Sequence, residues 1–205
     1  LTRALNWENC ALLINSLKPY ACCRHTHAAD YCAQLLRGEH RLEPEHITRI
    51  VDHTYQVAVN TVDNPEPSTP YGYKFSGQYC TAAMLVYGHL GESAFTPEAT
   101  SDPRVRRLMD KITLVCDPEL EASYQADRNR WAHRLEVTLE DGRVLTRQVE
   151  YPYGDFNNPF TWAYEHEKFH TLADGVLDPD RVAALVERLP HLEELDDINR
   201  LFEGL

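Results

Sequence analysis

The sequence lacks several features that would place the protein in a specialised class. No apolar run reaches the roughly 18–20 residues that a membrane-spanning helix needs, and the first residues do not resemble a signal peptide. A basic excess is also missing, because 20 Lys and Arg residues stand against 32 Asp and Glu residues, for a net charge of −12. Such a field repels phosphate, which argues against nucleic acid and anionic membranes as partners. Internal repeats and low-complexity segments are absent as well.

Cysteine pairs of the C-x-x-C type, which are typical of zinc and redox sites, are missing too. Cys22 and Cys23 are adjacent in the sequence and cannot easily bridge each other. Further along the chain, Cys32, Cys80 and Cys116 lie in apolar runs, where a free thiol behaves as a small hydrophobe. We therefore predict free thiols in a reducing, cytoplasmic setting, although the even total of six cysteines permits disulfides.

At 205 residues the chain is long enough to bury a core. Apolar alternation and turn signals predict strands over 10–18, 51–59, 112–117, 131–139 and 143–151. Helix-start signals predict a buried helix over 76–87, a helix over 26–36 that Gly38 follows, and helices opening near Ser101, Thr161, Asp178 and Leu192. Strands mixed irregularly with helices indicate an α+β fold. We place the boundary near 155, between an α+β domain (1–155) and a helical tail (156–205).

Residues 17–30, LKPYACCRHTHAAD, gather a lysine, an arginine, two histidines and two cysteines in an acidic chain. A zinc site would need paired ligand spacings, and a redox site would need C-x-x-C or a resolving partner. The segment lies between a predicted strand end and a predicted helix start, where free N–H groups and the helix dipole favour an anion. We therefore interpret it as an anion-binding segment, the alternative being that Lys18 and Arg24 are plain surface charges.

Five segments of the sequence, in order, resemble the MmgE/PrpD family of 2-methylcitrate dehydratase-like proteins. They are KPYACCRHTHAAD, TPYGYKFSGQYCTAAMLVYG, SDPRVRRLMDKITL, a hairpin with EDGR, and YPYGDFNNPFTWAYEHEKF. The likeness covers nearly the whole chain, yet chains of the family are more than twice as long. The resemblance therefore implies the C-terminal half only, a smaller α+β lid domain followed by helices. An N-terminal helical domain of the same protein is expected to precede Leu1 and to bring the general base.

The chemistry that the resemblance implies is a lyase reaction on a small polycarboxylate, without cofactor or metal. Dehydration of 2-methylcitrate, a step of propionate metabolism, removes a proton next to a carboxylate. Positioned cations and donors must then neutralise the charge that builds on that carboxylate. Decarboxylase and epimerase activities stay open, and a homodimer is the expected assembly. A non-catalytic polycarboxylate-binding or assembly module, and a metal-dependent hydrolase built on the Cys and His residues, are the competing hypotheses.

The resemblance also implies roles for individual residues. Lys18 matches a lysine that faces the substrate, and His27 matches the Thr-His step that leads into the helix. Cys23 stands where some members carry a histidine used in the chemistry, which leaves the role of that position open. These three residues are the candidate catalytic group. Substrate binding is expected from Lys18 together with Arg24, Lys74, Gln78 and Tyr79.

Three further positions bear on the choice between activities. Val59 falls roughly where related decarboxylases carry a tyrosine, which argues against decarboxylation. His166 and His170 have an i, i+4 spacing that can bind a metal, but no acidic partner pattern surrounds them. We interpret these two histidines as surface residues.

Overall fold

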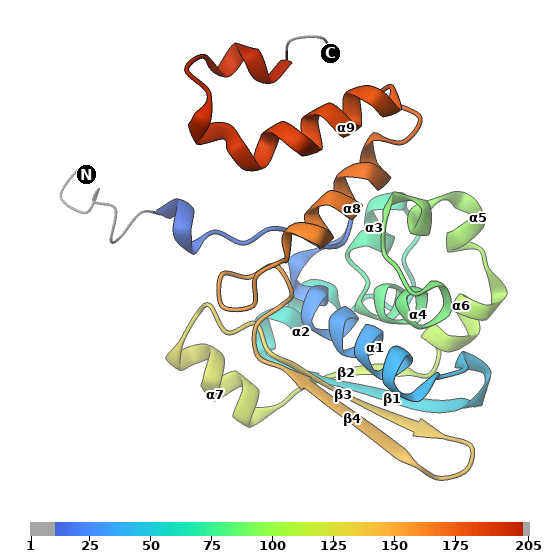
Figure 1. Cartoon of the computed structure of the whole chain (residues 1–205). Helices are drawn as coiled ribbons and strands as arrows, with labels where there is room; N and C mark the ends of the chain where they lie inside the picture. The colour runs from blue at the N-terminus through green and yellow to red at the C-terminus, as the bar shows by residue number, and fades with distance from the viewer. Residues whose placement is uncertain (1–10, 203–205) are drawn as a thin grey trace. The chain divides into compact units, whose positions relative to one another are not determined.

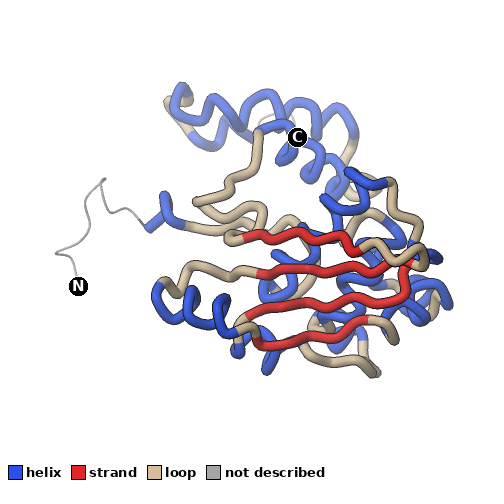
Figure 2. Tube along the Cα trace, turned by 90° about the horizontal axis from the view of Figure 1, so that it is seen from below, coloured by secondary structure: helices blue, strands red, loops and turns tan. Residues whose placement is uncertain are grey.

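A four-stranded mixed sheet organises the first part of the molecule in the computed structural model, which describes residues 11–202. Its strands, in the spatial order β2-β1-β3-β4, are Ile112–Cys116, Ile47–Thr54, His133–Leu139 and Val144–Val149. Strand β1 pairs in parallel with β2 and antiparallel with β3, and β3 forms the hairpin with β4. The four strands lie side by side in Figure 2. This sheet together with the helices confirms the α+β class.

Helices cover one face of this sheet. Helix α1 (His27–His40) packs against β3 and β4, and α4 (Gly77–Tyr87) packs against α1 and β2 (Figure 1). The residues of strand β3 alternate between buried and half-exposed, so one face of the sheet is buried and the other is partly open to solvent. Leu135 and Val137 are fully buried in the core, while Arg134 and Glu136 lie on the other face. This period-two alternation is the pattern that predicts the hairpin.

Helix α4 is the centre of the core, as its apolar sequence predicts. Seven consecutive residues, 79–85, are completely buried. At its start the Ser76 hydroxyl accepts a hydrogen bond from the backbone N–H of Tyr79 at 3.0 Å, and at its end Gly88 takes a left-handed conformation with φ +80°. Each end of the helix is therefore closed by a residue suited to it. The predicted helix over 76–87 is confirmed.

Shorter helices fill the connections. Between β1 and β2 lie α2 (Gln56–Val62), α3 (Pro70–Lys74), α5 (Pro97–Thr100) and α6 (Pro103–Met109). Helix α7 (Pro118–Ala126) connects β2 to β3. Asp102 caps α6 through the N–H of Arg104 at 2.8 Å, as the Ser-Asp-Pro signal predicts. Helices α3, α5 and α7 are not predicted from the sequence.

One predicted strand is wrong, and a second is right only in its first half. Residues 11–14 of the predicted strand 10–18 form a 3-10 helix, and residues 15–18 belong to no strand; Cys10 lies outside the described residues. The apolar side chains of Ile14 and Leu17 are exposed, so this segment has no sheet face to bury. The predicted strand 51–59 ends at Thr54, and α2 begins at Gln56.

The error at α2 has a clear physical cause. Tyr55, Ala58 and Val62 are fully buried, a spacing of three and four residues that belongs to a helix face. Val57 and Val59, which completed the strand-like alternation, are exposed and half-exposed instead. The alternation is therefore accidental beyond β1.

Helix α1 also differs from its prediction. It extends to His40, so Gly38 lies inside the helix, and Arg41 provides the left-handed C-terminal residue with φ 49°. Its N-terminal neighbour Thr26 makes no side-chain capping bond, because its hydroxyl donates to the Asp30 carboxylate at 2.7 Å. The helix begins after Thr26, as predicted, although Thr26 does not cap it with its side chain, and the end predicted at Gly38 is wrong.

The described residues fall into two compact units, the first ending at Pro159 and the second beginning at Phe160. The second unit contains α8 (Trp162–Ala173) and α9 (Pro179–Arg188), which start at the capping residues Thr161 and Asp178. In place of the third predicted helix it has two 3-10 helices, Leu189–Glu194 and Ile198–Phe202. No helix among residues 11–202 is long and apolar enough to cross a membrane.

Candidate functional site

The Lys18 turn, which we define as residues 16–27, is held in place by a buried carboxylate. Asp155, in the loop 152–158, is only 2% exposed. It forms an ion pair with the guanidinium of Arg24 and accepts a hydrogen bond from the Ser16 hydroxyl at 2.8 Å. Both ends of the turn are therefore fixed to the same side chain. The charge of Arg24, a candidate substrate ligand, serves this anchor.

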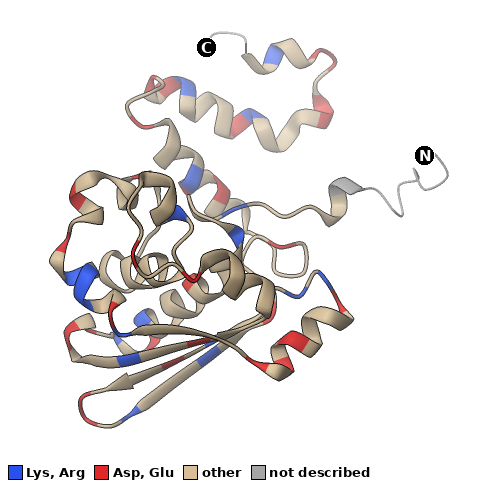
Figure 3. Cartoon of the chain, turned by 180° about the vertical axis from the view of Figure 1, so that it is seen from behind, with Lys and Arg blue, Asp and Glu red and all other residues tan. Residues whose placement is uncertain are grey.

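Lys18 is the exposed cation of this turn. Its ammonium group donates one hydrogen bond, to the carbonyl oxygen of Cys22 at 3.0 Å. Within residues 11–202 no carboxylate forms an ion pair with it. Because an ammonium group has three donors, two N–H groups and the full charge stay available for an anion. Figure 3 shows acidic residues on helices and loops of the chain, which carries a net charge of −12.

Cys23 lies next to this cation and is buried. Its backbone N–H donates to the carbonyl of Lys74 at 2.8 Å. Burial raises the pKa of the Cys23 thiol, and the backbone N–H of His25 and the charge of Lys18 oppose that rise only in part. The thiol is therefore protonated at neutral pH, and it is a poor general base.

His27, the last residue of the turn, is buried. It is 1% exposed, its Nε2 is 3.4 Å from the carbonyl oxygen of Cys22, and its ring meets that of Tyr20 edge to face at 5.2 Å. The first turn of α1 is buried with it. The structure therefore offers no open helix N-terminus here, and the predicted anion site depends on Lys18.

A buried group of two thiols and a carboxyl supports the turn from below. Atoms of Cys22, Asp30 and Cys80 lie within 4.8 Å of one another, and all three residues are buried. Burial raises the pKa of both Asp30 and Cys80. Within residues 11–202 this is the one group of three such ligands, and a zinc site usually needs four donors. Because Thr26 already binds the Asp30 carboxyl, the group fits a hydrogen-bonded core best.

The segment 69–88, which carries the candidate residues Lys74, Gln78 and Tyr79, contacts the Lys18 turn through the backbone carbonyl of Lys74. The ammonium of Lys74 pairs with Glu92 at 2.8 Å. The side-chain amide of Gln78 donates to Asp63 at 2.6 Å, and the buried hydroxyl of Tyr79 donates to a backbone carbonyl. All three side chains thus have partners inside the protein. Their roles in substrate binding remain predictions.

Sequence reasoning missed a polar network beside the turn. His25 Nδ1 lies 2.7 Å from the hydroxyl of Tyr55. Next to this pair, the buried carboxylate of Asp52 binds Nδ1 of His133 at 2.8 Å, and Nε2 of His133 lies 3.0 Å from the Thr54 hydroxyl. Apart from His25, which belongs to the segment 17–30, no local signal marks these residues, because β1, β3 and the turn bring them together only in the folded chain.

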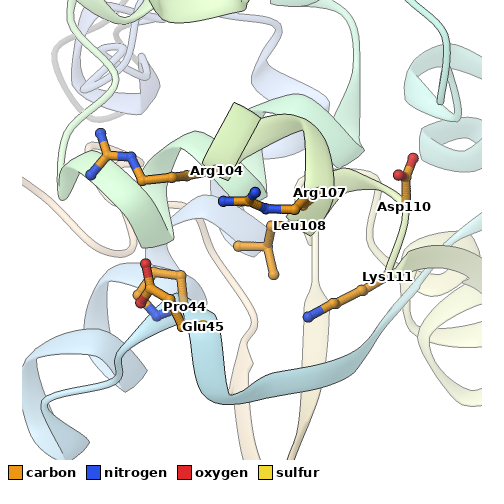
Figure 4. Close-up of a pocket in the computed structure, with 7 residues that line it drawn as sticks. All are labelled: Pro44, Glu45, Arg104, Arg107, Leu108, Asp110 and Lys111. Atoms are coloured by element: carbon orange, nitrogen blue, oxygen red, sulfur yellow. The ribbon is translucent and has the colours of Figure 1, made fainter. Parts of the chain in front are cut away.

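The cavity in Figure 4 is a separate feature, of about 390 Å³. Arg104 and Arg107 of α6 and Lys111 line it. Arg104 pairs with Asp102 at 2.8 Å, and Lys111 donates to the carbonyl of Ile47. None of the candidate residues lines this cavity, and two of its three cations already have partners.

An α+β domain whose anchored turn presents a lysine without an acidic partner among residues 11–202 can receive an anion. Comparison with known proteins assigns this class of domain to a family. The family model described as MmgE/PrpD C-terminal domain matches residues 20–191. The chain belongs to the MmgE/PrpD family.

Several curated proteins are similar to the chain. The mitochondrial 2-methylcitrate dehydratase of Yarrowia lipolytica is 32% identical over 136 residues, which cover 63% of this chain and 26% of that protein. The 2-methylcitrate dehydratase of Cupriavidus necator is 35% identical over 111 residues, covering 53% and 23%. The cis-aconitate decarboxylase of Aspergillus terreus is 28% identical over 203 residues, covering 92% and 40%. The matched region therefore spans between about a quarter and two fifths of these relatives.

Proposed function

We propose that the chain forms the C-terminal part of a cofactor-free lyase that acts on small polycarboxylates, of the 2-methylcitrate dehydratase type. The observation that carries this proposal is Lys18, an exposed ammonium with no acidic partner among residues 11–202, on a turn anchored by a buried ion pair. The names of the relatives support the class of reaction, since dehydratases and decarboxylases are both lyases.

In this proposal Lys18 binds a carboxylate of the substrate and stabilises the charge that develops there as a neighbouring C–H bond breaks. A charge-assisted hydrogen bond of this kind contributes roughly 1.5–3 kcal/mol. Fixed charges and donors stabilise a transition state best when they need no rearrangement. The anchor between Arg24 and Asp155 provides that rigidity, because it holds the turn before any ligand binds.

The general base is a separate question. The thiol of Cys23 is protonated and His27 is buried, so neither is well placed to remove a proton from a bound substrate. We propose that the base comes from an N-terminal helical domain of the same protein, and that the assembled enzyme is a homodimer. If the protein has no N-terminal helical domain, the alternative is that this chain binds the polycarboxylate without converting it.

A decarboxylase is the second candidate activity. The similarity to the Aspergillus terreus decarboxylase extends over 92% of this chain, more than the similarity to either dehydratase above. Val59 nevertheless presents an aliphatic side chain from α2 at the position where the family resemblance implies a tyrosine in decarboxylases. We therefore place dehydration first.

Kinetics of the protein as its gene encodes it test this proposal. With 2-methylcitrate as substrate, the unsaturated product is followed by its ultraviolet absorbance. Lys18→Ala should lower kcat/KM by roughly 10- to 100-fold, and Lys18→Arg should restore only part of it, because the guanidinium is a wider planar group. Arg49→Ala, which removes an exposed cation of β1, is the matched control and should change little. A Lys18→Ala enzyme within twofold of wild type would contradict the proposal.

A further inference from the structure

The ring of His25 is fixed by residues from two other parts of the chain. It stacks on the indole of Trp131 with a centroid distance of 4.4 Å and an interplanar angle of 7°. The indole is itself held, because its N–H donates to the carbonyl of Arg128 at 2.8 Å. On the edge of the imidazole, Nδ1 lies 2.7 Å from the Tyr55 hydroxyl. Face and edge contacts together leave the ring one orientation.

The contact with Tyr55 also determines which ring nitrogen carries the hydrogen. Tyr55 is fully buried, and within residues 11–202 its hydroxyl has a single hydrogen-bond partner, Nδ1 of His25. A buried phenol O–H needs an acceptor, so it donates to Nδ1. The hydrogen of the neutral imidazole is then on Nε2. Burial raises the pKa of Tyr55, so the phenol keeps its proton.

The charge state of His25 agrees with this arrangement. Burial lowers the pKa of its imidazole to about 4, and the nearby His133, Arg24 and His27 act in the same direction. The ring is therefore neutral at physiological pH. Such a ring donates a hydrogen bond without adding charge.

The Nε2–H group belongs to the same cluster as Lys18. No residue between 11 and 202 forms a hydrogen bond with Nε2. The ring is also only partly buried. Both the backbone N–H of His25 and the charge of Lys18 lower the pKa of the Cys23 thiol, so the two residues lie near the same side chain of this turn. The Nε2–H is therefore a neutral donor of this turn that has no partner among residues 11–202.

We propose that His25, oriented by Tyr55 and Trp131, donates its Nε2–H to a carboxylate of the ligand bound at Lys18. This inference rests on the proposed function, because it assumes a polycarboxylate at the Lys18 turn. The ammonium of Lys18 attracts the anion by its charge, and the oriented N–H of the neutral imidazole donates a directional hydrogen bond to it. The thiol of Cys23 is a weak donor and suits this role less well. Tyr55 is a positioning residue in this arrangement.

Binding of tricarballylate, a tricarboxylate with no hydroxyl group to eliminate, tests the inference in the protein as its gene encodes it. The amide nitrogen of Gln occupies about the place of Nε2, whereas Asn reaches only the place of Nδ1. His25→Asn should therefore weaken binding by roughly 10- to 100-fold, as expected for one hydrogen bond from a neutral donor to a charged acceptor, and His25→Gln should restore most of it. His40→Asn, at the other end of α1, is the matched control and should bind as wild type does.

Nitrogen NMR of the histidine rings provides a readout that a purely structural role would not move. In the free protein His25 should show a protonated Nε2 and an unprotonated Nδ1, and tricarballylate should shift the Nε2 resonance. Tyr55→Phe should mix the two tautomers. An Nε2 resonance that ignores the ligand, or equal binding by wild type and His25→Asn, would overturn the inference. If the role of His25 were overturned while Lys18→Ala still abolished binding, the proposed function would hold without it. A wild-type protein that binds no tricarboxylate would overturn the proposed function and the role of His25 together.

Discussion

Asp155 is the residue whose loss should disturb the Lys18 turn most. Its buried carboxylate binds the guanidinium of Arg24 and the hydroxyl of Ser16. Removing one partner of a buried ion pair destabilises a protein by about 3–5 kcal/mol. The Arg24 side chain is 25% exposed, however, so water takes over part of its solvation. We expect Asp155→Ala to lower the free energy of unfolding by about 2–3 kcal/mol.

Urea and thermal unfolding measure this loss. For a chain of this size the expected change corresponds to a decrease in Tm of about 4–12 °C. A double-mutant cycle with Arg24→Ala should give a coupling energy of at least about 1 kcal/mol, because the two side chains are in direct contact. Asp196→Ala, which breaks the exposed pair between Asp196 and Arg200, is the control and should be nearly neutral. Additive effects of the two substitutions, or an unchanged unfolding midpoint for Asp155→Ala, would refute the reasoning.

Three further predictions follow from other features. Burial lowers the pKa of His25 to about 4, whereas the unfolded ring titrates near its ordinary value of about 6.5. The unfolded state therefore binds more protons between these values, and stability should fall by about 1–2 kcal/mol as the pH drops from 6.5 to 4, with partial exposure limiting the effect. The free energy of unfolding should depend less on pH across this range in His25→Gln than in the wild type. An equal dependence on pH would count against the lowered pKa of His25. Gly88→Ala should cost about 1 kcal/mol in urea unfolding, since φ is +80° and the new Cβ would lie 2.9 Å from Arg37; an unchanged midpoint would show that the position tolerates a side chain. Residues 1–205 by themselves should not dehydrate 2-methylcitrate, and turnover above that of Lys18→Ala would contradict this.

Much of the fold could be predicted because its signals are local. The hairpin has a period-two pattern and an Asp-Gly turn, and α4 is apolar on all sides, so neither depends on distant residues for its recognition. The strand predicted over 10–18 failed because an apolar run becomes a strand only when the fold provides a neighbouring strand. The alternation over 51–59 was ambiguous in the same way, and burial of Tyr55, Ala58 and Val62 decided it in favour of a helix after Thr54.

The candidate site was predicted only in part. Lys18, Cys23 and His27 lie close together in the sequence, so their composition marked the turn before the structure was known. The partner of Arg24 comes from 131 residues further along the chain, and Tyr55 and Trp131 reach His25 from two other segments. Contacts of this kind depend on the packing of the whole unit, and a single sequence carries no local sign of them.

The most direct test of the central claim is the affinity of the Lys18 turn for a polycarboxylate. Isothermal titration of the protein as its gene encodes it with tricarballylate, at two salt concentrations, would measure it. We predict binding that weakens with added salt, a Kd raised by roughly 10- to 100-fold in Lys18→Ala, and an unchanged Kd in Arg49→Ala. A Kd for Lys18→Ala within twofold of wild type, or the absence of any binding, would contradict the account.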